Sequence, residues 1–202
     1  MLIFAPLVLG GLVVAAYGAW YLIGQNVETP AYTVAERDDS IEIRNYPPLV
    51  VAEVDRTGGR WEAVNQGFRA LAAYIFAKNR PGDTIAMTAP VTQQPAMAVG
   101  PDVGAAKPWA VRFIMPAQYS LSALPQPGGD VKLVPVPAGK RAAIRFSGVA
   151  TDDLLAQKEA ELKRWLDARG LAAKGPATYA YYNDPFTPGF LRRNEVMFDL
   201  GP

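Results

Sequence analysis

The chain has 202 residues, half of them hydrophobic, and 20 Lys and Arg against 19 Asp and Glu give a formal net charge of +1. This length suits one domain, or one domain with an appendage, and the near-neutral charge argues against a nucleic-acid partner. Cysteine and histidine are absent, which excludes disulfides, thiol nucleophiles and histidine-based catalysis or metal binding. Since no pair of carboxylates has a spacing typical of acid–base catalysis, we expect a protein that is not an enzyme.

The first 24 residues carry no charged side chain, and the first charge in the chain is Glu28. A helix over residues 2–23 would be about 33 Å long, enough to cross the apolar core of a bilayer. A cleaved signal peptide is the alternative, but this stretch lacks Lys and Arg and its apolar run is long. A buried core helix would show a polar face, and this stretch has none. The pattern favours an uncleaved transmembrane helix.

Aromatic residues near the end of this stretch support a membrane anchor, because Tyr17, Trp20 and Tyr21 stand where interfacial aromatics belong. The predicted organisation is a membrane anchor at residues 1–24, a tether at 25–31 and a globular domain at 32–202. With few Lys and Arg nearby, the positive-inside rule favours only slightly a single-pass protein with its globular domain on the outer (periplasmic or extracellular) side.

Small residues form a stripe along the predicted anchor, at Gly11, Ala15 and Ala19. Such a stripe lets two membrane helices approach closely, which would give a homodimer. The alternative is the generally high Gly and Ala content of membrane spans, and the sequence leaves both open.

The first half of the globular part predicts three strands, at residues 32–36, 40–44 and 49–55, and then an amphipathic helix from Trp61. Apolar residues of this helix recur at steps of three and four and share one face: Trp61, Val64, Phe68, Leu71, Ala72 and Ile75. Asn79 suits the left-handed position just past the helix end. Residues 85–91 (IAMTAPV) predict a strand that Pro90 confines to an edge or ends, and residues 94–108 predict a surface loop.

The second half repeats this plan. It predicts a strand at residues 109–115 and a hairpin of residues 131–136 with 141–146 around Pro137-Ala138-Gly139. A second helix follows, with Thr151 as N-cap and Gly170 at its end, and then strands at 178–182 and 195–200. A strand–helix–strand–strand unit used twice predicts an α+β fold with pseudo-twofold symmetry, in which a helix packed on the sheet borders a groove.

Six segments of the chain, in the same order, resemble the SOUL haem-binding protein family. They are Glu28-Thr29-Pro30, residues 41–46 (IEIRNY), 74–79 (YIFAKN), 85–91 (IAMTAPV), 109–116 (WAVRFIMP) and 192–196 (RRNEV). The resemblance covers about residues 28–198. It implies a distorted β-barrel or sheet flanked by two helices, and a ligand that is haem or another tetrapyrrole, bound non-covalently.

The resemblance also implies a binding mode, in which apolar contacts hold the tetrapyrrole and basic side chains meet its propionates. The candidate binding residues are Val64, Phe68, Arg69 and Ala72 on the first helix, Met87 in the following segment, and Phe186 and Phe190 in the loop before the last strand. Lys78 and Arg80 are further candidates for the propionates. Because His and Cys are absent, an axial iron ligand from this chain would have to be Met or Tyr, such as Met87 or Tyr74.

Polar residues cluster before the last predicted strand, where Arg193 and Glu195 would point to the same face. They could pair with Glu42 or Arg44, and a structural ion-pair network is the favoured interpretation over a functional polar site. The predicted function is a membrane-anchored SOUL-type domain that binds haem or another tetrapyrrole in a shallow apolar groove, for transport or buffering. The alternative is a protein-interaction or structural module that has kept the fold and lost the ligand.

Overall fold

The computed structural model describes residues 27–96 and 108–201. The predicted membrane anchor, with its stripe at Gly11, Ala15 and Ala19, and most of the loop at 94–108 lie outside these residues. Within the described ranges, no helix is both long and apolar enough to span a bilayer.

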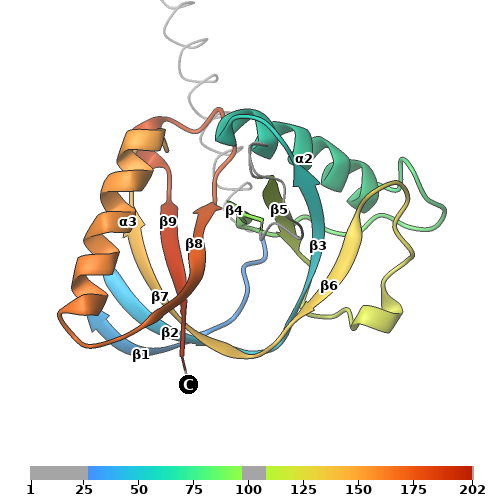
Figure 1. Cartoon of the computed structure of the whole chain (residues 1–202). Helices are drawn as coiled ribbons and strands as arrows, with labels where there is room; N and C mark the ends of the chain where they lie inside the picture. Colours follow the sequence, from blue (N-terminus) through green and yellow to red (C-terminus); the bar gives the residue numbers. More distant parts are fainter. Residues whose placement is uncertain (1–26, 97–107, 202) are drawn as a thin grey trace, which may run out of the picture.

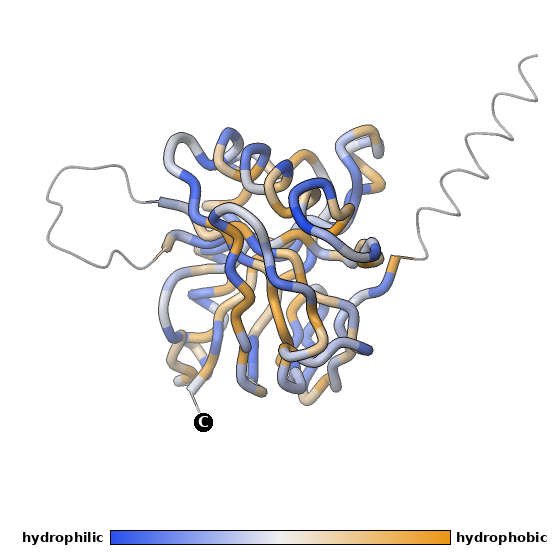
Figure 2. The backbone as a smooth tube through the Cα atoms, turned by 90° about the vertical axis from the view of Figure 1, so that its right-hand side faces the viewer, coloured by the Kyte–Doolittle hydropathy of each residue, from blue (hydrophilic) through white to orange (hydrophobic). Residues whose placement is uncertain are grey.

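The described residues form nine strands and two α-helices (Figure 1). The strands are β1 Thr33–Asp38, β2 Ile41–Tyr46, β3 Leu49–Arg56, β4 Val91–Pro95, β5 Trp109–Ile114, β6 Lys132–Val136, β7 Gly139–Phe146, β8 Ala173–Tyr181 and β9 Asn194–Leu200. The helices are α2 Arg60–Ile75 and α3 Asp152–Asp167, and two short 3-10 helices are η1 Leu121–Ala123 and η2 Gly189–Leu191. Hydrophobic and hydrophilic residues alternate along several strands, as expected for a sheet whose two faces differ (Figure 2).

All nine strands belong to one antiparallel sheet, in the order β1-β2-β7-β9-β8-β4-β5-β3-β6. The order β4-β5-β3 in the first half matches β8-β9-β7 in the second, and the halves meet where β4 pairs with β8. The predicted strand–helix–strand–strand repeat is therefore present. The sheet ends at β1 and β6 and does not close, so it is an open curved sheet and not a barrel.

The predicted hairpin around Pro137-Ala138-Gly139 is wrong. β6 pairs with β3, and its last residue, Val136, lies opposite Leu49. β7 pairs with β2, and its first residue, Gly139, lies opposite Tyr46. The chain therefore passes from one half to the other between β6 and β7, and again between β2 and β3 (Figure 1). Prolines stand at both crossings, and they interrupt the ladder because they have no N–H to donate.

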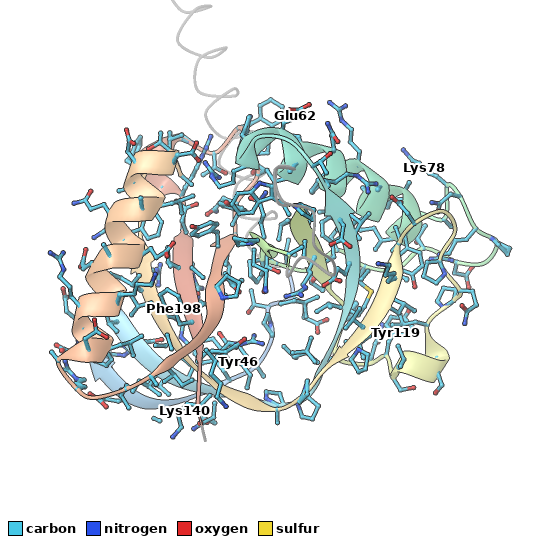
Figure 3. All side chains as sticks on the ribbon, in the orientation of Figure 1. Tyr46, Glu62, Lys78, Tyr119, Lys140 and Phe198 are labelled. Atoms are coloured by element: carbon cyan, nitrogen blue, oxygen red, sulfur yellow. The ribbon has the colours of Figure 1, made fainter. Side chains whose placement is uncertain are left out.

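Each helix covers its own half of the sheet. α3 buries Leu155, Leu162 and Leu166 against residues of β9 such as Phe198, which Figure 3 labels beside this helix. Its predicted start is confirmed, because the Thr151 hydroxyl accepts a hydrogen bond from the N–H of the third residue after it at 3.3 Å.

α2 packs on β3 and β5 with a face rotated from the predicted one. Its buried residues are Ala63, Val64, Gly67, Leu71, Tyr74 and Ile75, while Trp61 is 57% exposed and Phe68 is 38% exposed. The reason is Gly67, since a Cβ at this position would lie 2.6 Å from the Cβ of Val111 on β5. The absence of a side chain turns Gly67 toward the sheet and leaves the two aromatic side chains at the border.

Two further details after α2 differ from the predictions. Ala77, with a φ of 53°, occupies the left-handed position that was predicted for Asn79, because the Arg80 guanidinium binds the Tyr74 carbonyl and fixes an earlier helix end. The predicted strand at residues 85–91 is largely irregular chain that forms a single bridge to Glu28, and β4 begins only at its last residue.

Candidate ligand-binding site

An apolar stripe lies along one side of α2, and we call it the α2 flank: Trp61, Phe68, Ala72 and the C-cap residue Phe76. At about 100° per residue, these four positions fall within an arc of roughly 80° on the helix. Trp61 is 57%, Phe68 38% and Phe76 43% exposed. Three aromatic side chains that share one helix side and reach solvent form a surface suited to a flat apolar ligand.

The α2 flank is in contact with the hydrophobic core. The Phe68 ring meets the Phe113 ring of β5 edge-on, with centroids 5.3 Å apart, and Phe113 is buried. Val64, one turn before Phe68, is buried between α2 and the sheet, and Arg69 is exposed beside the stripe. Of the four predicted helix residues, Val64 therefore belongs to the core, Phe68 and Ala72 lie at the apolar border, and Arg69 is a cation exposed to solvent.

Four other candidates within or after α2 differ in their access to a ligand. Met87 is 39% exposed, so it is not part of the core, and Lys78 is exposed beyond the helix end (Figure 3). The Arg80 guanidinium is buried and donates to three backbone carbonyls. Tyr74 is fully buried, and its hydroxyl donates to the Pro125 carbonyl at 2.8 Å. Neither Arg80 nor Tyr74 can reach a surface ligand without losing these bonds.

Phe186 and Phe190 project from the loop between β8 and β9, 78% and 77% exposed. Hydrogen bonds hold the backbone of this loop in place. The Asp184 carboxylate accepts from two backbone N–H groups of the loop, and the Gly189 carbonyl accepts from the Gly148 N–H at 2.9 Å. Two large aromatic side chains held in solvent by such a loop are unusual for a surface with no partner.

Two hollows lie on the sheet face away from the helices. The smaller one, of about 260 Å³, is lined by residues of both halves, including Tyr46, Gln94, Arg112, Thr178 and Tyr182; Figure 3 labels Tyr46 between the strands of the two halves. Its volume is below the roughly 300–1,000 Å³ typical of drug-sized ligand sites.

The larger hollow, of about 640 Å³, we call the arginine hollow. Its lining residues are Tyr32, Arg37, Asp39, Ser40, Glu42, Arg44, Arg145, Phe146, Ser147, Phe190, Leu191, Arg192 and Arg193. Of the seven predicted site residues, Phe190 alone lines either of these two hollows.

A buried ion-pair network lies beside the arginine hollow. The Glu195 carboxylate accepts two hydrogen bonds from Arg44, at 2.8 and 3.0 Å, one from the Tyr182 hydroxyl at 2.8 Å, and two from Arg193, at 2.7 and 3.1 Å. Burial alone would raise the pKa of Glu195, but the hydrogen bonds and charges of Arg44 and Arg193 outweigh it and hold this pKa below its usual value. The predicted pairing of Glu195 with Arg44 is therefore confirmed, and it joins β2 to β9.

The sequence did not single out Arg37 or Arg145 as site residues. Both lie on strands, in which every second side chain points to the same face of the sheet. Alternation groups residue 145 with residues 141 and 143, and it could have placed Arg145 on the sheet face that also carries Glu195. The sequence could not show which strand pairs with β7. This strand is β9, and not β6, which precedes β7 in the chain.

The fold is an α+β domain made of two similar halves, each with its own helix. Residues 27–199 match the model of the SOUL heme-binding protein family. The chain belongs to this family.

Solved structures share the fold at low sequence identity. A protein described as a hydrolase from Listeria innocua is 13% identical with a TM-score of 0.56, covering 83% of this chain and 94% of that one. An uncharacterized conserved protein from the same organism is 15% identical with a TM-score of 0.55, covering 80% and 92%. The EcmrR C-terminal domain is 14% identical with a TM-score of 0.57, covering 84% and 98%. No curated protein sequence matches the chain significantly.

Proposed function

We propose that this protein binds haem or another tetrapyrrole non-covalently on the α2 flank, as a membrane-anchored carrier or buffer. Family membership supports the ligand class. The observation that carries the site is the exposed aromatic stripe of Trp61, Phe68 and Phe76, which gives a planar macrocycle an apolar surface continuous with the core.

The residues around the α2 flank fit such a ligand. Arg69 is an exposed cation beside the stripe and can pair with a propionate. The chain contains no His or Cys, so the exposed Met87 is the candidate axial ligand, and apolar contact would supply most of the affinity. A site of this kind releases its ligand readily, which suits carriage or buffering.

Titration of residues 27–202 with hemin, followed by absorbance and Trp fluorescence, tests this proposal. We expect saturable one-to-one binding that Phe68→Asp weakens by about tenfold or more, because the ring loses roughly 1.5–3 kcal/mol of apolar contact. Leu121→Asp is the matched control, since Leu121 has a similar exposure of 42% and lies in η1, outside the α2 flank.

Thermal melting of each variant separates loss of binding from loss of folding. Hemin binding that never saturates, or that is equal in Phe68→Asp and wild type, would exclude the α2 flank as the site. The alternative that the fold serves as a protein-interaction module would then be preferred.

A further inference from the structure

Positive charge is concentrated in the arginine hollow. Five arginines line it, from β1, β2, β7 and the segment before β9, against two lining carboxylates: Arg37, Arg44, Arg145, Arg192 and Arg193 against Asp39 and Glu42. Phe190 and Leu191 form part of its wall, so the hollow combines cations with apolar surface.

The two carboxylates that form ion pairs with these arginines, the lining Glu42 and the buried Glu195, neutralise only part of this charge. Glu195 accepts from Arg44 and Arg193, and Glu42 pairs with both Arg37 and Arg44. These two carboxylates are therefore shared among three arginines, and the other two arginines of the hollow have no part in these pairs.

Arg145 and Arg192 keep their charge available to a ligand. Arg145 is exposed and stands directly across the β7–β9 ladder from Glu195, yet within the described residues its side chain makes no hydrogen bond or ion pair. Arg192 donates only to two backbone carbonyls of the β8–β9 loop, which orient its guanidinium without neutralising it. Ser147, the residue directly after β7, adds an exposed hydroxyl donor to the same wall.

The rim of the arginine hollow is apolar and exposed. Phe190 and Leu191 line the hollow, and Phe186 projects from the same loop. Val149, 55% exposed, packs beside Gly189 of this loop. A cationic hollow with an aromatic rim is complementary to a molecule that carries an anionic group on an apolar body.

We propose that the arginine hollow binds the headgroup of an anionic phospholipid at a bilayer surface. Arg145, Arg192 and Ser147 would hold the phosphate, while Phe186 and Phe190 enter the boundary between headgroups and acyl chains. Charge complementarity and the exposed aromatic rim carry the proposal. The uncharged first 24 residues of the chain are consistent with a domain that works close to a membrane.

Calorimetric titration of the full chain in a non-ionic detergent, with soluble dihexanoyl phosphatidic acid as the probe, tests the proposal. We expect saturable binding that weakens as salt is added. Arg145→Gln should weaken it by about tenfold or more, because a charge-assisted hydrogen bond is lost. Arg145→Lys should restore part of the affinity. The matched control is Arg164→Gln, an exposed arginine on α3, which should bind as wild type does.

Three further probes identify the occupant. Dihexanoyl phosphatidylcholine should bind at least about tenfold more weakly than phosphatidic acid, since its headgroup has no net charge. Inorganic phosphate that binds as tightly as phosphatidic acid would overturn the proposal in favour of a free-anion site. Hemin that displaces phosphatidic acid would overturn it in favour of a tetrapyrrole site. If phosphatidic acid itself shows no saturable binding, the hollow is not a lipid site.

Discussion

Among single side chains, Glu195 depends strongly on its hydrogen-bond partners, because it is a fully buried carboxylate that binds two arginines and a tyrosine. A buried charge pair adds little net stability compared with apolar packing, but removing one partner leaves the others uncompensated. The network therefore fixes the register of β2, β7 and β9 more than it strengthens the fold.

Glu195→Gln tests this role. At pH 7 we expect the free energy of unfolding to fall by about 3–5 kcal/mol, because Arg44 and Arg193 lose their shared counter-charge. Since the pKa of Glu195 is lowered in the folded state, its contribution is present above the ordinary carboxyl pKa, near 4.5, and is lost as the pH falls through the folded-state value.

Urea unfolding of both proteins between pH 7 and pH 3 measures this effect. The difference between wild type and Glu195→Gln should shrink toward the acid end. Glu161→Gln is the control, because this carboxylate forms a partly exposed pair with Lys158 and should change stability by less than about 1 kcal/mol at either pH. A difference that stays constant with pH would contradict the prediction.

At the scale of elements, the side of α2 that faces the sheet depends on one glycine. The sequence periodicity correctly predicted a helix here, but it grouped Trp61 and Phe68 with the core. Periodicity identifies an apolar arc, and it does not identify which edge of that arc comes closest to the sheet. Gly67 decides this, because only a residue without Cβ allows the approach to Val111.

Gly67→Ala should therefore destabilise the protein by about 1–3 kcal/mol, although alanine favours helices more than glycine does. The alanine methyl would meet Val111 and push α2 away from β5. Gly59→Ala provides the control, since nothing lies within 4 Å of a Cβ at this position. Thermal unfolding of the two variants compares them, and a Gly67→Ala protein as stable as wild type would show that α2 does not need this contact.

For the whole molecule, the uncharged stretch at residues 1–24 predicts that the full chain fractionates with membranes and resists an alkaline carbonate wash. Val13→Asp with Val14→Asp should move the protein to the soluble fraction, because each Asp at the centre of a spanning helix costs about 2.5–3.5 kcal/mol. Val13→Leu with Val14→Leu should behave as wild type. Release of the wild-type chain by the wash would contradict an anchor.

The sequence by itself determined most elements of the globular part, the strand–helix–strand–strand repeat and the start of α3. These features depend on local periodicity, capping and alternation, which neighbouring residues specify. The predicted ligand residues were named from a resemblance, and their exposure could not be read from the chain.

Tertiary structure decided which strands pair and which surfaces remain open. Pairing between strands that are distant in the chain brings together residues far apart in the sequence, such as Arg44 and Glu195, separated by 151 positions. The same pairing sends β6 and β7 to opposite halves and collects the arginines of β1, β2 and β7 in one hollow. Non-local backbone pairing carries no local sequence signal, because many alternative registers satisfy the same alternation of apolar and polar residues.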